Sequence, residues 1–188
     1  HDYTSERRYV IRIVPYKGTD YDMIIIAQNG LIAKHCKSGS WTILEDLKIS
    51  DIMDATLIGN ELYLSFAENV KIENISKPCG LMAYSLDTGK KRILISNQKL
   101  VDKNPVDQLE KFEISSLSPN DDKLLFIVKT ENKNEHISFL NIKDDSVIIL
   151  KTVNGGNLSL NTQGGSPVAY YWPFNIILDF DSSQLPGI

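Results

Sequence analysis

Histidine and cysteine are scarce in this sequence, which holds only 3 histidines and 2 cysteines among its 188 residues. His1, His35 and His136 are the only imidazoles available as general bases near neutral pH. Cys36 and Cys79 are too few for a disulfide scaffold, and they lack the Cys-x-x-Cys spacing of zinc and redox sites. The sequence therefore favours a non-catalytic protein without a metal or another cofactor.

The two cysteines leave two interpretations open. They are expected as two buried or half-buried thiols, with one structural disulfide in an oxidising compartment as the alternative. His35 next to Cys36 suggests a thiol and its base, but adjacent strand residues point to opposite faces of a sheet. The pair is therefore not expected to act as a nucleophile.

An excess of positive charge and a long apolar run are also missing. Lys and Arg number 20 against 24 Asp and Glu, for a net charge of −4, so no positive field favours nucleic acid. The apolar run at 22–27 is far shorter than the roughly 18–20 residues of a membrane-spanning helix. His1 in place of a starting Met leaves the compartment open and favours a secreted or periplasmic location.

Short alternating runs separated by turn residues dominate the rest of the sequence. With 42% hydrophobic and 23% charged residues, the chain is expected to fold as a single β domain over 1–188. Turn signals such as Asn29-Gly30, Gly59-Asn60 and Asp87-Thr88-Gly89 divide the runs into antiparallel hairpins. The predicted units cover residues 9–44, 55–96 and 114–150, with a partial unit at 168–180. Helix is expected only near 104–112, after the cap residue Asn104.

The spacing between the units indicates a repeat. Gly30-Leu31 and Gly39 in the first unit stand 50 positions before Gly80-Leu81 and Gly89 in the second. Repeats of about 40–50 residues with four strands each are typical of propeller blades. The expected fold is therefore all-β, with antiparallel four-strand units in a small or partial β-propeller. A β-sandwich is the alternative.

Two short motifs carry a family resemblance. The run from Ser116 to Ile127, SLSPNDDKLLFI, resembles the Ser-Pro-Asp-Gly-Lys run of TolB-type and WD40-like propeller blades. The run from Tyr84 to Gly89, YSLDTG, resembles the outer hairpin of the same blades. The resemblance covers roughly residues 8–152, and it implies binding of proteins or small ligands at the mouth of the central channel.

Aromatic side chains are the best candidates for a binding surface. Tyr and Trp supply a large contact area at a low cost in entropy. The candidates are Tyr170, Tyr171, Trp172 and Trp41, for which packing in the core is the competing interpretation. Acidic pairs such as Asp144-Asp145 are explained by turn formation and lack the spacing of a calcium loop, so no metal site is expected.

These observations favour a binding module that recognises a protein partner through its loops and the C-terminal aromatic region. One alternative is a propeller-type hydrolase acting on a carbohydrate, with two carboxylates brought together from distant loops. Another is a fragment of a larger propeller protein.

The strand count raises the question of closure. Three units of four strands plus two C-terminal strands leave an open sheet edge, which invites aggregation. The N-terminal strand at 9–16 is expected to cover this edge by packing beside 168–180. The alternative is a second chain at the same edge, which would make the protein a homo-oligomer.

Overall fold

The computed structural model describes residues 10–18, 20–47, 51–67, 79–96, 105–109, 112–120, 122–154, 157–161, 168–172 and 176–179. Side chains from residue 153 onward lie outside this description. The strands are β1 (Val10–Pro15), β2 (Tyr21–Ala27), β3 (Leu31–Cys36), β4 (Trp41–Asp46), β5 (Asp51–Ile58), β6 (Glu61–Ala67), β7 (Cys79–Ser85), β8 (Lys91–Ile95), β9 (Phe112–Asn120), β10 (Lys123–Thr130), β11 (Asn134–Asn141), β12 (Val147–Asn154), β13 (Asn157–Asn161), β14 (Val168–Trp172) and β15 (Ile176–Asp179). A 3-10 helix, η1, spans Pro105–Gln108.

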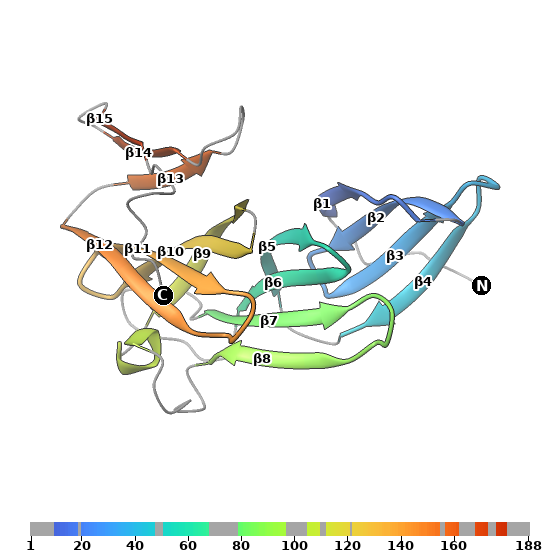
Figure 1. Ribbon diagram of the computed structural model, residues 1–188, viewed down its shortest axis with the longest axis horizontal. Coiled ribbons are helices and arrows are strands. Elements are labelled where there is room, and N and C mark those ends of the chain that lie inside the picture. The colour runs from blue at the N-terminus through green and yellow to red at the C-terminus, as the bar shows by residue number, and fades with distance from the viewer. Residues whose placement is uncertain are drawn as a thin grey trace.

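The strands form four antiparallel sheets in chain order. Sheet 1 contains β1–β4, sheet 2 contains β5–β8, sheet 3 contains β9–β12, and the C-terminal sheet contains β13–β15. Figure 1 shows sheets 1, 2 and 3 one after another along the molecule, with the C-terminal sheet at the end farthest from sheet 1. The prediction of an all-β fold built from antiparallel four-strand units is confirmed.

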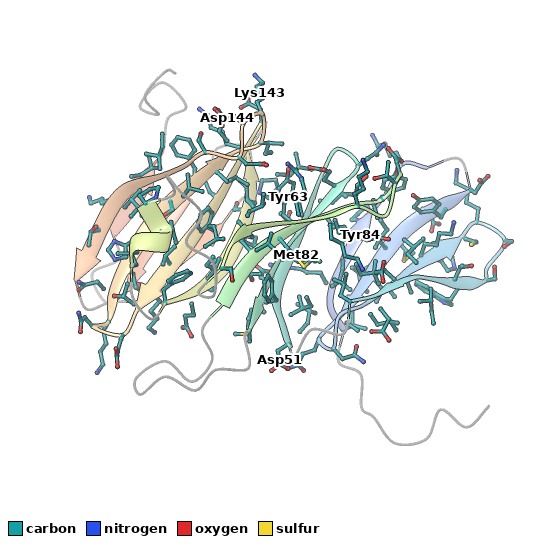
Figure 2. All side chains as sticks on the ribbon, turned by 90° about the horizontal axis from the view of Figure 1, so that it is seen from below. Asp51, Tyr63, Met82, Tyr84, Lys143 and Asp144 are labelled. Carbon is teal, nitrogen blue, oxygen red and sulfur yellow. The ribbon has the colours of Figure 1, made fainter. Side chains whose placement is uncertain are left out.

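Sheets 1 and 2 pack face to face through aliphatic and aromatic side chains. Ile24, Ile26 and Ile32 of sheet 1 are fully buried against a cluster from sheet 2 that includes Leu64 and Met82. Figure 2 shows Met82 and Tyr84 between these two sheets. Burial of apolar surface on this scale supplies the main force that holds the sheets together.

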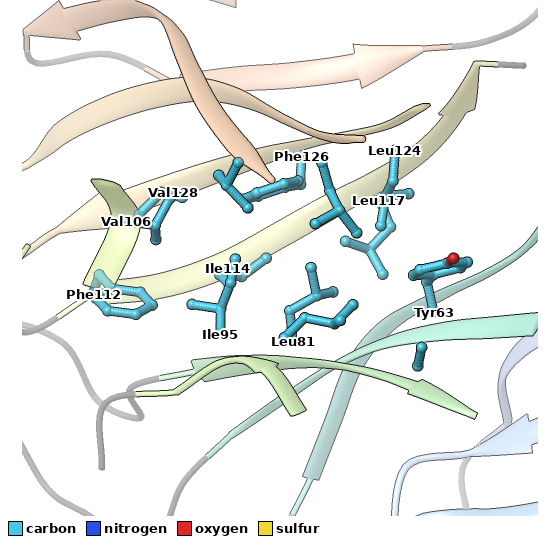
Figure 3. Packing of buried hydrophobic residues seen from close by; sticks show 14 residues of the cluster. Tyr63, Leu81, Ile95, Val106, Phe112, Ile114, Leu117, Leu124, Phe126 and Val128 are labelled. Atoms are coloured by element: carbon cyan, nitrogen blue, oxygen red, sulfur yellow. The ribbon is translucent and has the colours of Figure 1, made fainter. Parts of the chain in front are cut away.

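A second cluster joins sheets 2 and 3. Tyr63 and Leu81 of sheet 2 pack against Ile114, Leu124 and Phe126 of sheet 3, and all five are fully buried (Figure 3). The middle strands of sheet 2, β6 and β7, thus pack against sheet 1 on one face and against sheet 3 on the other. This explains why β6 is a nearly continuous apolar run with buried residues from Leu62 to Ala67.

A polar link ties together the strands β1, β5 and β9, which lie next to one another. Arg12 Nε donates a hydrogen bond to Asp54 Oδ1, and the backbone N–H of Leu117 donates to Asp54 Oδ2, both at 2.8 Å. The N–H of Ala55 also donates to Asp54 Oδ1. Asp54 therefore bonds to sheets 1 and 3 as well as to its own strand.

Each of the three strands β1, β5 and β9 has an irregularity in its pairing close to the hydrogen bonds of Asp54. The register shifts between Val10 and Arg12 in β1, between Ile52 and Asp54 in β5, and in β9 opposite the step from Leu125 to Ile127. Ser116, in the irregular part of β9, has φ 56°. A bulge releases backbone groups from the ladder, which frees the Leu117 N–H for Asp54.

Three expectations are corrected. The described chain has three C-terminal strands, β13, β14 and β15, instead of the two predicted. The expected helix at 104–112 is a single 3-10 turn at 105–108. Cys36 is a free thiol, so the disulfide alternative is wrong. His136 is buried, and its Nδ1 is hydrogen-bonded to Thr152 Oγ1 at 2.9 Å.

The proposed closure by the N-terminal strand is also wrong. β1 pairs with β2 inside sheet 1 and lies beside β5. The C-terminal sheet instead approaches sheet 3, where β13 lies beside β9 and β10, and Figure 1 shows it well apart from β1. A hairpin between β1 and β2 closes a short loop and therefore costs little entropy. Pairing of β1 with residues 168–180 would close a much longer loop at a higher cost.

Candidate functional site

The candidate site is the face of sheet 1 that points away from sheet 2. Successive side chains of a strand point to opposite faces. Because Ile24, Ile26 and Ile32 point toward sheet 2, their neighbours in β2 and β3 point outward. We call this surface the outer face.

Strand register arranges the outer face into two rows that cross all four strands. The first row is Ile13, Ile25, Ala33 and Ile43, each paired with the next across neighbouring strands. The second row is Pro15, Met23, His35 and Trp41, paired in the same way. Seven of these eight side chains are apolar, and His35 is the one ionisable group in the two rows.

The outer face is open, unlike the corresponding surfaces of sheets 2 and 3. Ile13 is 58% exposed, Ile43 is 56% exposed and Trp41 is 50% exposed. The middle strands β6 and β10, by contrast, are buried on both faces along five or more consecutive residues. An apolar surface of this kind, left open on one sheet, is typical of a protein contact site.

One polar cluster borders the second row. The rings of His35 and Trp41 lie 4.7 Å apart at an angle of 55°. His35 Nδ1 bonds to Asp22 Oδ1 at 2.8 Å. This bond holds the pKa of Asp22 below its usual range. The indole of Trp41 is therefore in contact with His35 on one side, and Trp41 is 50% exposed.

The histidine of this cluster has no thiol partner. Cys36 pairs with Tyr21, which packs toward sheet 2, and its Sγ lies 3.7 Å from Thr42 Oγ1. His35 lies on the outer face, so the sheet separates the two side chains. That His35 and Cys36 do not act together as a nucleophile and its base stays a prediction.

The hydrolase alternative requires two carboxylates that face each other. Glu61 and Asp145 approach each other because both bind Arg92, through Nη2 at 2.8 Å and Nη1 at 2.5 Å. Tyr63 Oη also donates to Glu61 Oε2 at 3.0 Å. The guanidinium joins the two acids as an ion-pair network between sheets 2 and 3.

Among the residues that the structure describes, no group of three or more His, Cys, Asp or Glu side chains could hold a metal ion. None of the helices described is long and apolar enough to cross a membrane.

Comparisons with known proteins establish the fold. The chain matches the solved structure of the N-terminal domain of Nup159, a β-propeller, with a TM-score of 0.50 at 12% sequence identity. The match covers 90% of this chain and 42% of that one, so the chain spans less than half of the matched structure. No family model matches the sequence, and a search of curated proteins finds no significant match.

The fold is thus a partial β-propeller, as predicted, and the sandwich alternative does not hold. The likeness supports a propeller-like fold in general and does not extend to the TolB-type or WD40-like groups in particular. At 12% sequence identity, the likeness to Nup159 shows only the fold.

The structure places the predicted site residues unevenly. Trp41 lies at the start of β4 on the outer face. Tyr170, Tyr171 and Trp172 belong to β14, but their side chains lie outside the described part of the chain. Trp41 is therefore not brought together with the C-terminal aromatic group by anything described.

Sequence analysis missed the other members of the outer face. Ile13 and Ile43 stand in strands that carry apolar residues at both alternating positions, so the pattern does not single them out. Apolar residues on both faces predict a sheet covered on both sides. The sequence pattern alone does not show that one of the two faces of sheet 1 is left without a sheet packed against it.

Proposed function

We propose that the protein is a non-catalytic binding module that recognises a protein partner through the outer face of sheet 1. The observation that carries this proposal is the contrast between sheet 1, whose outer face is open, and sheets 2 and 3, whose middle strands are buried on both sides. Trp41 and Ile43 are the expected anchors, since half-exposed aromatic and aliphatic groups lose the most water on contact. The loops and Tyr170, Tyr171 and Trp172 remain proposed additional contacts.

Quantitative affinity capture from the native source tests this function. The immobilised wild-type chain is compared with Trp41→Asp and Ile43→Lys, which place a charge in the outer face. Ile93→Lys is the matched control, because Ile93 is 46% exposed but lies on β8 of sheet 2. One dominant partner that is retained by the wild type and Ile93→Lys and lost by both outer-face variants supports the proposal. Equal capture by all four proteins refutes it.

The remaining alternative is that these residues form part of a larger propeller protein. The match to only 42% of the Nup159 chain is compatible with that alternative. Mass spectrometry of the native polypeptide decides it directly, since the 188 residues account for 21.2 kDa.

A further inference from the structure

We propose that Asn29-Gly30, in the turn between β2 and β3, is a modification site that folding protects. When this turn opens, Asn29 is converted to isoaspartate, and the altered turn loses bonds that link sheet 1 to sheet 2. The sequence contains two Asn-Gly pairs, at 29–30 and 154–155. The second pair starts at the end of β12, and Gly155 lies outside the described residues.

The reaction needs only the chain itself and water. The deprotonated backbone nitrogen of Gly30 attacks the side-chain carbonyl carbon of Asn29 and closes a five-membered succinimide, while the bond to the side-chain nitrogen breaks and ammonia leaves. Water then opens the ring at one of its two carbonyl groups. One opening gives aspartate, and the other gives isoaspartate, in which the former side chain carries the main chain. Glycine favours the attack because it has no Cβ and few conformational restrictions.

In the folded chain the attacking nitrogen is already engaged. Gly30 is buried, and its N–H donates a hydrogen bond to the carbonyl oxygen of Ala27 at 3.0 Å. The side-chain oxygen of Asn29 accepts a hydrogen bond from the Leu31 N–H at 3.4 Å. Attack therefore requires that the Gly30 N–H leave its partner and lose its proton to solvent. This happens only when the turn opens locally.

The same turn binds both ends of the connection between sheets 1 and 2. The N–H of Leu47, just after β4, donates to the carbonyl oxygen of Gly30 at 3.1 Å. The N–H of Ile52, in β5, donates to the carbonyl oxygen of Gln28 at 2.6 Å. The Gln28 side chain adds a third bond, from Nε2 to Asp51 Oδ1 at 3.1 Å. Three hydrogen bonds to the end of sheet 1 and the start of sheet 2 thus depend on one short turn.

Isoaspartate changes the length of this turn. It inserts one extra carbon into the main chain between the carbonyl groups of Gln28 and Gly30, so the two oxygens cannot both keep their partners. Ile52 is 1% exposed, and a buried N–H that loses its acceptor destabilises the fold. Aspartate at the same position leaves the main chain unchanged. The two products of one reaction are therefore expected to differ in stability.

Incubation of the 188-residue chain at mildly alkaline pH tests the protection. Isoaspartate is followed at both Asn-Gly pairs by peptide mass spectrometry and by labelling with a methyltransferase specific for isoaspartate. In concentrated urea the two pairs should react at similar rates, and Asn29→Gln should remove the signal from the first. In buffer, Asn29 should react at least about tenfold more slowly than in urea. Equal rates for Asn29 in buffer and in urea would overturn the proposal.

A second measurement tests the effect on the link between the sheets. The Asn154→Gln chain, which keeps 29–30 as its one Asn-Gly pair, is converted in urea, separated and refolded. Its urea midpoint is expected below that of the Asn29→Asp variant in the same background, which has the same charge and a main chain of normal length. Failure of the isoaspartate chain to refold where Asn29→Asp refolds is the same result in stronger form. Equal midpoints would refute the role of the turn in linking the sheets.

Discussion

At the scale of single residues, Asp54 links the three four-stranded sheets. Its carboxylate accepts hydrogen bonds from Arg12, from the Ala55 N–H and from the Leu117 N–H. The Asp54 side chain is 10% exposed, whereas the Arg12 side chain is 51% exposed. The guanidinium keeps much of its hydration without its partner, but a backbone N–H that loses the carboxylate is left buried and unpaired.

Asp54→Ala should therefore lower the free energy of unfolding by about 2–3 kcal/mol. Arg12→Gln should lower it by less than about 1 kcal/mol, since ion pairs with a half-exposed partner contribute little. Urea unfolding of both variants measures the difference. Equal losses in the two variants would mean that the backbone hydrogen bonds to Asp54 do not contribute as described.

His136 gives stability a dependence on pH. Burial lowers the pKa of His136, because the charged imidazolium is disfavoured inside sheet 3. The unfolded chain then binds a proton at a higher pH than the folded chain does. Stability is fully present above the ordinary histidine pKa of about 6.5 and is lost as pH falls through that range.

The wild type is expected to lose stability between pH 7.5 and pH 5.5, with a contribution from His136 of at most about 1.4 kcal/mol per pH unit. His136→Gln should show a smaller loss over the same interval. Urea midpoints at the two pH values measure this, and midpoints at pH 7.5 and 8.5 serve as the control interval. An identical loss in the variant would show that another group titrates.

At the scale of elements, Gly80 allows β7 to lie between its neighbours. A Cβ at this position would stand 2.5 Å from Phe66 Cζ and 2.8 Å from the carbonyl oxygen of Ile95. Phe66 pairs directly with Gly80 across β6 and β7. Both neighbours are buried, so neither can move without disturbing the cluster between the sheets.

Gly80→Ala is expected to destabilise the protein by about 1–3 kcal/mol through overpacking. Gly59→Ala is the comparison, because Gly59 has φ +58° in a turn but open space around its Cβ. Its cost is the strain of that φ alone, about 1 kcal/mol. Thermal unfolding of both variants should place Gly80→Ala lower, and the reverse order would contradict the packing described for β7.

At the scale of the whole molecule, β1 stabilises the fold through sheet 1 itself. Ile11 and Val14 pack against the cluster between sheets 1 and 2, and Arg12 reaches Asp54. Deleting residues 1–16 should therefore lower the free energy of unfolding by several kcal/mol, on the order of a lost buried strand, or yield insoluble protein.

The control for this deletion is Ile13→Thr, which changes an exposed position of the same strand. Its effect on the free energy of unfolding should stay within about 0.5 kcal/mol. Urea unfolding and solubility of the two proteins measure the difference. A truncated chain as resistant to urea as the wild type would show that β1 is not an integral part of sheet 1.

The strands and their grouping into four-strand units follow from local sequence patterns. Alternating apolar residues and turns such as Gly59-Asn60 and Asp87-Thr88-Gly89 define hairpins whose partners are close in the chain. Such pairing depends on local signals, so the four-strand units could be predicted from the pattern. β13 has the same alternation in Asn157–Asn161, but three of its five residues are polar, so the apolar pattern that predicts the other strands is weak there.

Which sheet faces are covered depends on long-range packing that local patterns do not record. Asp54 meets Arg12 across 42 positions and Leu117 across 63, and no local pattern records such contacts. The outer face of sheet 1 has the apolar composition of a buried face, and yet Trp41 and Ile43 are half exposed. Periodicity tells which side chains share a face, but whether that face is covered depends on sheets that stack over long distances in the chain.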